Sequence, residues 1–183
     1  MSMFCAQCQE AAKNTGCTVR GVCGKQESTS GLQDVLVYAA RGLAVAMTAL
    51  HEAKERTEKG DTTPVDSDDS LDDITTDTGR ILFKALFTTV TNVSFDDERI
   101  AQTTFDVLRH KDHVVRRLSA ASLDQGDLPE IAGWTVETGD TDGLQSRIPV
   151  ASVLTDTNDD TRALRELATY GLKGISAYGD HAG

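Results

Sequence analysis

The fold is decided by one stretch that follows the amino-terminal segment, residues 30–50, which reads SGLQDVLVYAARGLAVAMTAL. Its apolar residues recur at steps of three and four, the spacing that places side chains on one face of an α-helix. Ser28 or Ser30 can cap the helix start, and the helix should run to about Glu58 and stop at Gly60. The expected apolar stripe consists of Leu32, Val35, Leu36, Ala39, Leu43, Met47 and Leu50.

Two further helical patterns follow in the middle of the chain. The first has an expected inner face of Ile74, Ile81, Leu82, Ala85, Leu86, Thr89 and Val93. The second is capped by Ser94 or Asp96, and its stripe is Ile100, Phe105, Leu108, Val115 and Leu118. The acidic residues 61–73 between the first two helices predict a solvated linker, because Pro64 disfavours helix and the carboxylates repel one another. A calcium loop is disfavoured there, since the Gly and closing Glu of an EF-hand are not in place.

The last sixty residues mix irregular and helical signals. Residues 123–143 predict an irregular stretch that Trp134 pins to the helices, and residues 150–154 predict a short strand or extended piece. A final helix should begin near Asn158, which can cap it. Its apolar residues are Leu164, Leu167, Leu172, Ile175 and Tyr178. Gly171 and Gly174 each cost up to about 1 kcal/mol relative to Ala, which predicts a close helix contact around them.

These patterns predict one compact, mainly α domain: a helical bundle over residues 28–183, with a cysteine-rich loop, residues 1–27, folded against it. The apolar pattern is still running at Gly183, so we expect a fragment of a larger multi-domain protein, a split gene product or a shortened paralogue. No apolar run is long enough to span a membrane, and the start lacks the features of a signal peptide. We expect a cytoplasmic protein with reduced thiols.

The chain of 183 residues carries a formal net charge of −11, which argues against a nucleic-acid partner because such binding needs clustered Lys and Arg. Asp is about twice as frequent as Glu, and Lys is scarcer than Arg. Such a surface is typical of salt-adapted, halophilic organisms, in which hydrated carboxylates keep proteins soluble. An ordinary acidic cytosolic protein is the alternative interpretation.

The only four cysteines lie close together, in the spacing C-x2-C-x8-C-x5-C, at Cys5, Cys8, Cys17 and Cys23. One tight turn between the first two can direct both thiolates at one metal centre. Three glycines surround the other two cysteines and let backbone amides approach sulfur: Gly16, Gly21 and Gly24. We therefore predict that all four cysteines bind one metal centre.

Spacing alone leaves three interpretations open. A redox dithiol would need no second pair, and no βαβ pattern follows the C-x2-C. Zinc usually takes its four ligands from two C-x2-C knuckles, whereas the second pair here is separated by five residues. An iron–sulfur cluster accepts compact, uneven cysteine loops. Iron–sulfur is favoured, and zinc is a serious rival.

The residues around the cysteines resemble a motif of a known protein family. The segments MFCAQCQE at residues 3–10, NTGCT at residues 14–18 and GVCGK at residues 21–25 closely resemble the amino terminus of the hybrid cluster protein family, also called the hydroxylamine reductase or prismane family. The likeness continues more weakly, in order, to the end of the chain. It includes Leu32-Gln33-Asp34, Arg41-Gly42, Thr91-Asn92, Asp96-Asp97, Arg165-Glu166-Leu167, Gly171-Leu172-Lys173-Gly174, Ala177-Tyr178 and His181.

The resemblance implies that Cys5, Cys8, Cys17 and Cys23 ligate a cubane [4Fe–4S] cluster. Family members with wider spacing carry a [2Fe–2S] cluster instead. The resemblance also implies a separate catalytic centre, a hybrid iron–sulfur–oxygen cluster that reduces hydroxylamine to ammonia and nitric oxide to nitrous oxide. An electron-donating reductase is then the expected partner, with no membrane contact implied.

The sequence departs from the family in one decisive respect: no cysteine follows Cys23. The four histidines, His51, His110, His113 and His181, match no ligand position of the hybrid cluster. His110 and His113 are three apart on a helix, yet no carboxylate motif accompanies them, so a solvated face is the favoured interpretation. We therefore predict no catalytic residues here, and an electron-transfer role toward a hybrid cluster on a separate polypeptide. The alternative is a non-catalytic zinc or iron–sulfur module with a structural or sensing role.

Overall fold

The computed structural model describes residues 3–8, 12–59, 71–120 and 128–182 of the chain. Over these residues the only β pairing is a single antiparallel bridge between Cys5 and Cys17, which confirms the prediction of a mainly α protein. Most of the acidic linker lies outside the described residues. The elements are η1 (Ala12–Asn14), α1 (Glu27–Glu58), α2 (Leu71–Thr88), α3 (Asp97–Ala120), α4 (Glu130–Gly133), α5 (Thr141–Ala151), η3 (Val153–Thr155) and α6 (Asp159–Ala182).

The long helix α1 is the centre of the core, as its apolar periodicity predicts. All seven residues of the expected stripe are buried, with exposed fractions between 0% and 7%. On its different sides α1 packs against α2, α3, α4 and α5. Burial of this apolar surface is the main force that holds the bundle together. The core residues that α3 and α5 contribute include Ile100, Leu108, Leu118 and Leu144.

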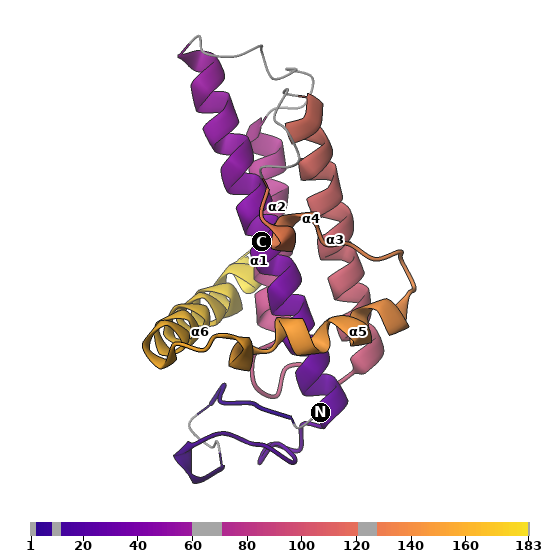
Figure 1. Ribbon diagram of the computed structural model, residues 1–183, viewed down its shortest axis with the longest axis vertical. Coiled ribbons are helices and arrows are strands. Elements are labelled where there is room, and N and C mark those ends of the chain that lie inside the picture. The colour runs from indigo at the N-terminus through magenta and orange to yellow at the C-terminus, as the bar shows by residue number, and fades with distance from the viewer. Residues whose placement is uncertain (1–2, 9–11, 60–70, 121–127, 183) are drawn as a thin grey trace.

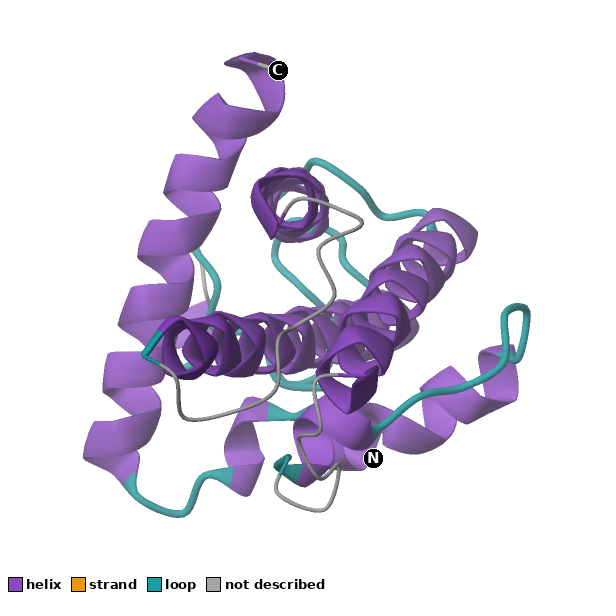
Figure 2. Cartoon of the chain, turned by 90° about the horizontal axis from the view of Figure 1, so that it is seen from above, coloured by secondary structure: helices purple, strands orange, loops and turns teal. Residues whose placement is uncertain are grey.

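The helices form an upright bundle with a crosswise second layer. In Figure 1, α1, α2 and α3 stand together, and α5 and η3 cross them near the lower end. Figure 2 looks down on this bundle and shows α6 alongside it, on the outside, where it packs on α2. The cysteine-rich loop covers the lower end of the bundle (Figure 1).

Two of the predicted caps are present and begin their helices. Asp96 accepts a hydrogen bond from the Arg99 amide at 3.1 Å, one residue before α3. Asn158 accepts one from the Thr161 amide at 2.9 Å, one residue before α6. Each side chain satisfies an amide that has no partner inside its helix, which is why these helices begin where they do.

The predicted strand over residues 150–154 is wrong, and the stretch before it is less irregular than expected. Residues 141–151 form α5, and residues 153–155 form the 3₁₀ turn η3. Asp140 begins α5 by accepting a hydrogen bond from the Gly143 amide at 2.8 Å. Three apolar side chains, Leu144, Ile148 and Ala151, face the core, and this short set gives too weak a periodic signal to predict a helix.

Trp134 packs the segment after α4 against the core, which confirms the prediction that this residue holds the segment to the helices. Its ring meets the Tyr38 ring edge-on, with centroids 5.6 Å apart. The guanidinium of Arg147 lies 4.7 Å from the Tyr38 centroid and 5.0 Å from that of Trp134, in cation–π geometry. The fully buried Lys111 donates a hydrogen bond from Nζ to the Trp134 carbonyl oxygen. This burial lowers the pKa of Lys111 to about 8.

Helix α6 differs most from expectation. The five apolar residues of its predicted pattern, Leu164, Leu167, Leu172, Ile175 and Tyr178, are all exposed, while Lys173 and Ser176 are buried. The close contact predicted around Gly171 and Gly174 is also wrong for the part of the chain that the structure describes. A Cβ atom built at either glycine would have nothing within 4 Å.

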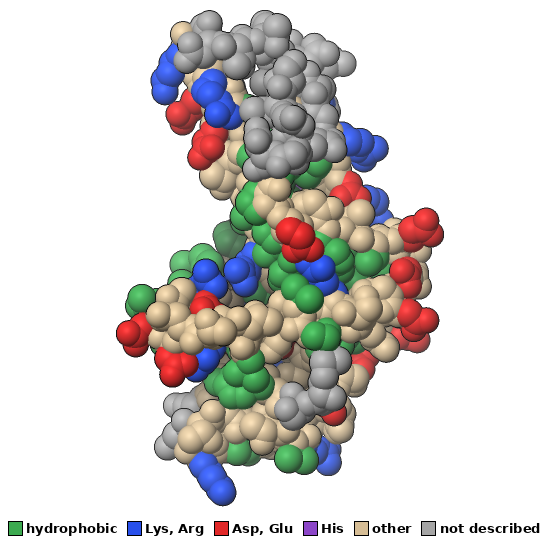
Figure 3. All heavy atoms as spheres, in the orientation of Figure 1, with side chains coloured by type: hydrophobic (Ala, Val, Ile, Leu, Met, Phe, Trp, Pro, Cys, Tyr) green, Lys and Arg blue, Asp and Glu red, His purple; other side chains and the backbone are tan. Residues whose placement is uncertain are grey.

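The surface carries the acidic character of the sequence. Figure 3 shows Asp and Glu side chains spread over the face in view, most densely at its right-hand edge. Of the helices in the described residues, none is long and apolar enough to cross a membrane.

Candidate metal centre

The first part of the cysteine loop is held by backbone pairing of Cys5 with Cys17. The Cys5 amide donates to the Cys17 carbonyl oxygen at 3.0 Å, and the Cys17 amide donates to that of Cys5 at 2.8 Å. Gly16 makes this approach possible, because its φ of +123° is one that side chains with a Cβ rarely adopt. A Cβ at Gly16 would also lie 2.7 Å from an edge atom of the Phe4 ring.

The second part of the loop is a glycine turn that carries Cys23. The Gly21 amide donates to the Lys25 carbonyl oxygen at 2.9 Å, and the Gly24 amide donates to that of Gly21 at 2.8 Å. Gly24 has a φ of +94°, and a Cβ at Gly21 would lie only 3.1 Å from Cys23 Sγ. The two glycines therefore allow the backbone to turn tightly around the thiol.

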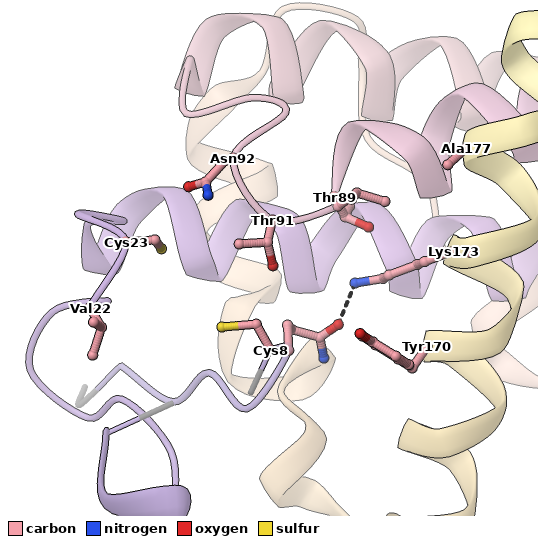
Figure 4. Close-up of a pocket in the computed structure, with 12 residues that line it drawn as sticks. Cys8, Val22, Cys23, Thr89, Thr91, Asn92, Tyr170, Lys173 and Ala177 are labelled. Atoms are coloured by element: carbon pink, nitrogen blue, oxygen red, sulfur yellow. Dashed lines mark hydrogen bonds between the residues drawn. The ribbon is translucent and has the colours of Figure 1, made fainter. Parts of the chain in front are cut away.

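Cys8 and Cys23 line one pocket of ≈ 610 Å³. Its walls come from three parts of the chain: the cysteine loop, the turn that follows α2 at residues 89–92, and the side of α6 that carries Tyr170 and Lys173. Figure 4 shows the side chains of Cys8 and Cys23 extending toward one another from opposite sides of this space. Two of the four predicted ligands thus share one cavity, and backbone pairing joins the other two, Cys5 and Cys17, to each other.

Two buried lysines carry positive charge to the loop. Lys25, 2% exposed, donates from Nζ to Gln33 Oε1 at 2.6 Å, and Nζ lies 3.8 Å from Cys5 Sγ. Lys173, 6% exposed, donates to Gln7 Oε1 at 2.6 Å (Figure 4). A buried ammonium stabilises negative charge in its neighbourhood, since little water screens it. Lys25 therefore places a positive charge next to Cys5, and Lys173 places one next to Gln7 of the same loop.

The side-chain amide of Gln7 connects the loop to α6 through hydrogen bonds at both its oxygen and its nitrogen. Its oxygen accepts from Lys173, and its Nε2 donates to Glu166 Oε2 at 2.7 Å. Burial lowers the pKa of Lys173 to about 8, and the positive charge of Lys25 also lowers it. Burial raises the pKa of Asp34, on the facing side of α1, to about 7, against the attraction of Lys173.

The four cysteines supply an all-sulfur donor set, which either a zinc ion or an iron–sulfur cluster can accept. All four thiols are free. No three His, Cys, Asp or Glu side chains among the described residues form a group that could hold one metal ion. A [4Fe–4S] cluster binds each thiolate at a different iron and accepts amide hydrogen bonds at sulfur, so its ligands surround a larger group than one ion. The prediction that all four cysteines bind one centre stays a prediction.

Lys25 and Lys173 are the site residues that sequence reasoning missed. Lys25 stands in GVCGK, directly after the last cysteine motif, but one lysine in a loop carries no periodic signal. Lys173 lies opposite the apolar stripe of α6, which indicates a solvated position in the sequence. Only the packing of α6 against the loop brings it to Gln7.

Within the described residues, the histidines belong to no group of three or more His, Cys, Asp or Glu that could hold a metal ion. His110 Nε2 lies 2.8 Å from Thr78 Oγ1, and burial lowers the pKa of its ring. The His113 ring centroid is 6.2 Å from that of His110. Both residues are half-buried, so the expected solvated face is only partly exposed. His51 is exposed near Thr75, and the side chain of His181 lies outside the described part of the chain.

Comparison with known proteins agrees with the cysteine motif. Residues 3–183 match the Prismane/CO dehydrogenase family. The chain is 39% identical to the hydroxylamine reductase of Halothermothrix orenii, with 100% of this chain aligned to 30% of that protein. It is 38% identical to the hydroxylamine reductase of Methanocaldococcus jannaschii and 37% identical to that of Nitratidesulfovibrio vulgaris, in each case over 98% of this chain. The chain spans less than a third of the length of these relatives. From its cysteine motif through α6, the chain belongs to the Prismane/CO dehydrogenase family.

Proposed function

We propose that this chain is the electron-transfer domain of a hydroxylamine reductase-type oxidoreductase. Cys5, Cys8, Cys17 and Cys23 would bind a [4Fe–4S] cluster, and such a cluster supplies one-electron redox chemistry when bound. The observation that carries the proposal is the gathering of the cysteines at one end of the bundle. Cys8 and Cys23 line one pocket there, beside the bridge between Cys5 and Cys17. Membership of a family whose proteins bind iron–sulfur clusters supports the proposal.

The other residues around the loop have roles that follow from their charge and position. Lys25 and Lys173 would offset the negative charge of the thiolates and so raise the reduction potential of the site. The turn at Gly21 and Gly24 would leave room for backbone amides beside Cys23 Sγ. Gln7 would hold the loop against α6.

In the complete protein, reduction of hydroxylamine to ammonia consumes two electrons and two protons and releases water. We place this reaction, or the reduction of nitric oxide, on a hybrid iron–sulfur–oxygen cluster held outside the chain described here. An electron-donating reductase would supply single electrons to this domain, in the cytoplasm, where thiols remain reduced. The isolated chain is therefore expected not to turn over hydroxylamine. Measured turnover that Cys17→Ser abolishes would contradict this division of labour.

Anaerobic reconstitution with ferrous iron and sulfide tests the metal centre. We expect a brown protein with four iron and four sulfide per chain, whose broad visible absorbance bleaches on reduction. Cys17→Ser should lose most of this absorbance, whereas Thr18→Ser, at the exposed neighbouring position, should retain it. A colourless protein that holds one zinc per chain would overturn the proposal in favour of a structural zinc module.

A further inference from the structure

A second pocket, of ≈ 470 Å³, lies between α2 and α3 and shares no lining residue with the pocket at Cys8 and Cys23. Its volume falls within the range of small-molecule sites, about 300–1,000 Å³. Asp106 is the acidic side chain on its wall, although the chain as a whole carries a net charge of −11. The basic side chains on the wall are Lys84, Arg109, His110, His113 and Arg116. We call this site the α2–α3 pocket; it gathers basic groups on an acidic protein.

The carboxylate of Asp106 is already engaged. Its Oδ1 accepts a hydrogen bond from Arg109 at 2.7 Å and one from Gln102 Nε2 at 3.2 Å. The charge of Asp106 is thereby offset by that of Arg109, so it repels an entering anion less than a free carboxylate would.

The charges of Lys84 and Arg116 have no counter-ion in the part of the chain that the structure describes. Arg116 donates from Nε to the Asp112 carbonyl oxygen at 3.2 Å, a bond within its own helix. The carboxylate of Asp112 accepts instead from Thr135 Oγ1 at 3.1 Å. Lys84 stands on α2 and Arg116 on α3, so one ligand in the pocket can meet a cation from each helix.

The remaining donors and the apolar part of the wall suit the same ligand. His113 is half-buried and makes no hydrogen bond to another described residue, and its ring centroid lies 6.2 Å from that of His110. An imidazole N–H donates readily to an oxyanion. An arginine fork matches the geometry of phosphate oxygens, and a lysine supplies a point charge. Ile81 and Val107 add apolar surface to the wall.

We infer that the α2–α3 pocket binds the phosphate group of a small molecule, either free phosphate or a phosphate ester. Phosphate oxygens are acceptors, and the groups left available in this pocket are donors. The same charges repel a metal cation. In an ester, the organic part would lie against Ile81 and Val107. This site is separate from the candidate metal centre and does not depend on the proposed function.

Isothermal titration calorimetry on the whole chain tests this inference, with inorganic phosphate and phenyl phosphate as probes at constant ionic strength. We expect one phosphate site per chain. The double variant Lys84→Gln, Arg116→Gln should weaken binding roughly tenfold or more, because it removes two charge-assisted contacts. The control Arg80→Gln, Arg99→Gln removes the same charge from the same two helices, at exposed positions outside the pocket. Its affinity should stay within about twofold of wild type, because salt screens exposed charges at a distance.

The two probes distinguish the sources of the phosphate group. Tighter binding of phenyl phosphate would assign the site to a phosphate ester, and equal or weaker binding would assign it to free phosphate; both results support the inference. Binding of neither probe would overturn it. Equal weakening by the two double variants would also overturn it, because net charge rather than the pocket would then attract the anion.

Proton NMR locates the ligand on the wild-type chain, without any substitution. The imidazole signals of His110 and His113 should shift during the phosphate titration, whereas that of His51, which does not line the pocket, should not. Phosphate binding that leaves His110 and His113 unmoved would place the anion elsewhere and refute the inference.

Discussion

Replacing Gly42 by alanine should destabilise the protein, although the same change stabilises most helices. Gly42 lies inside α1, where alanine would gain up to about 1 kcal/mol from helix propensity. A Cβ at this position, however, would overlap the Ile131 carbonyl oxygen and lie 3.2 Å from its carbonyl carbon. These are backbone atoms of α4, so relief requires movement of the whole helix.

The matched control is Gly79→Ala in the interior of α2, where a new Cβ would meet nothing within 4 Å. In that variant the higher helix propensity of Ala should raise the free energy of unfolding by up to about 1 kcal/mol. Gly42→Ala has the same gain in propensity and also carries an overpacking cost of about 1–3 kcal/mol. The two variants should therefore differ by about 1–3 kcal/mol, the overpacking cost itself.

Urea unfolding measures both variants under identical conditions. Far-UV circular dichroism follows the helices, and the single tryptophan, Trp134, reports on the segment directly after α4. Gly42→Ala should lower the free energy of unfolding, and Gly79→Ala should raise it. Equal stabilisation by the two substitutions would refute the close packing of α1 against α4.

Three further substitutions test the cysteine loop, the half-buried carboxyl of Asp34 and the aromatic contact of Trp134. Gly16→Ala should lower iron and sulfide content after reconstitution while helix content stays unchanged, because a φ of +123° and a ring 2.7 Å away both exclude a Cβ. The pKa of Asp34 is raised from 3.8 to about 7, so its contribution to stability is complete below pH 3.8 and is lost as the pH rises through 7. Asp34→Asn should thus be more stable than wild type at pH 8 but not at pH 4, with a difference that grows by up to about 1.4 kcal/mol per pH unit in urea titrations. Arg147→Lys keeps the charge but loses the planar group over Tyr38 and Trp134, and should cost about 1 kcal/mol and change tryptophan fluorescence.

The helices with long apolar stripes were predictable, because their periodicity reports directly on the face that must leave water. All seven predicted residues of α1 are buried, and Asp96 and Asn158 begin α3 and α6 as capping residues. The same reasoning fails for α5, where Leu144, Ile148 and Ala151 are too few to establish a period. A hydrogen bond from Gly143 to Asp140, together with the surface of α1, decides that segment instead.

For α6, in contrast, periodicity predicted the helix but not which of its sides is buried. The pattern predicted a helix correctly and named its apolar residues, and the structure turns these residues outward. Periodicity shows that one face of a helix is apolar. It does not show whether the segment that covers this face belongs to the same chain. The inner side of α6 is chosen by Lys173 and Glu166, which meet Gln7 of the loop across more than 150 residues of sequence.

The sequence by itself determined the cysteine motif, its glycines and the family, because ligand spacing and backbone freedom are local properties of the chain. Only the tertiary structure decided that Cys8 and Cys23 share a pocket walled by α6, and that Lys25 lies 3.8 Å from Cys5 Sγ. It also decided which side of α6 faces water. The physical reason is that burial and charge pairing depend on contacts between distant segments, and these exist only once the helices have packed.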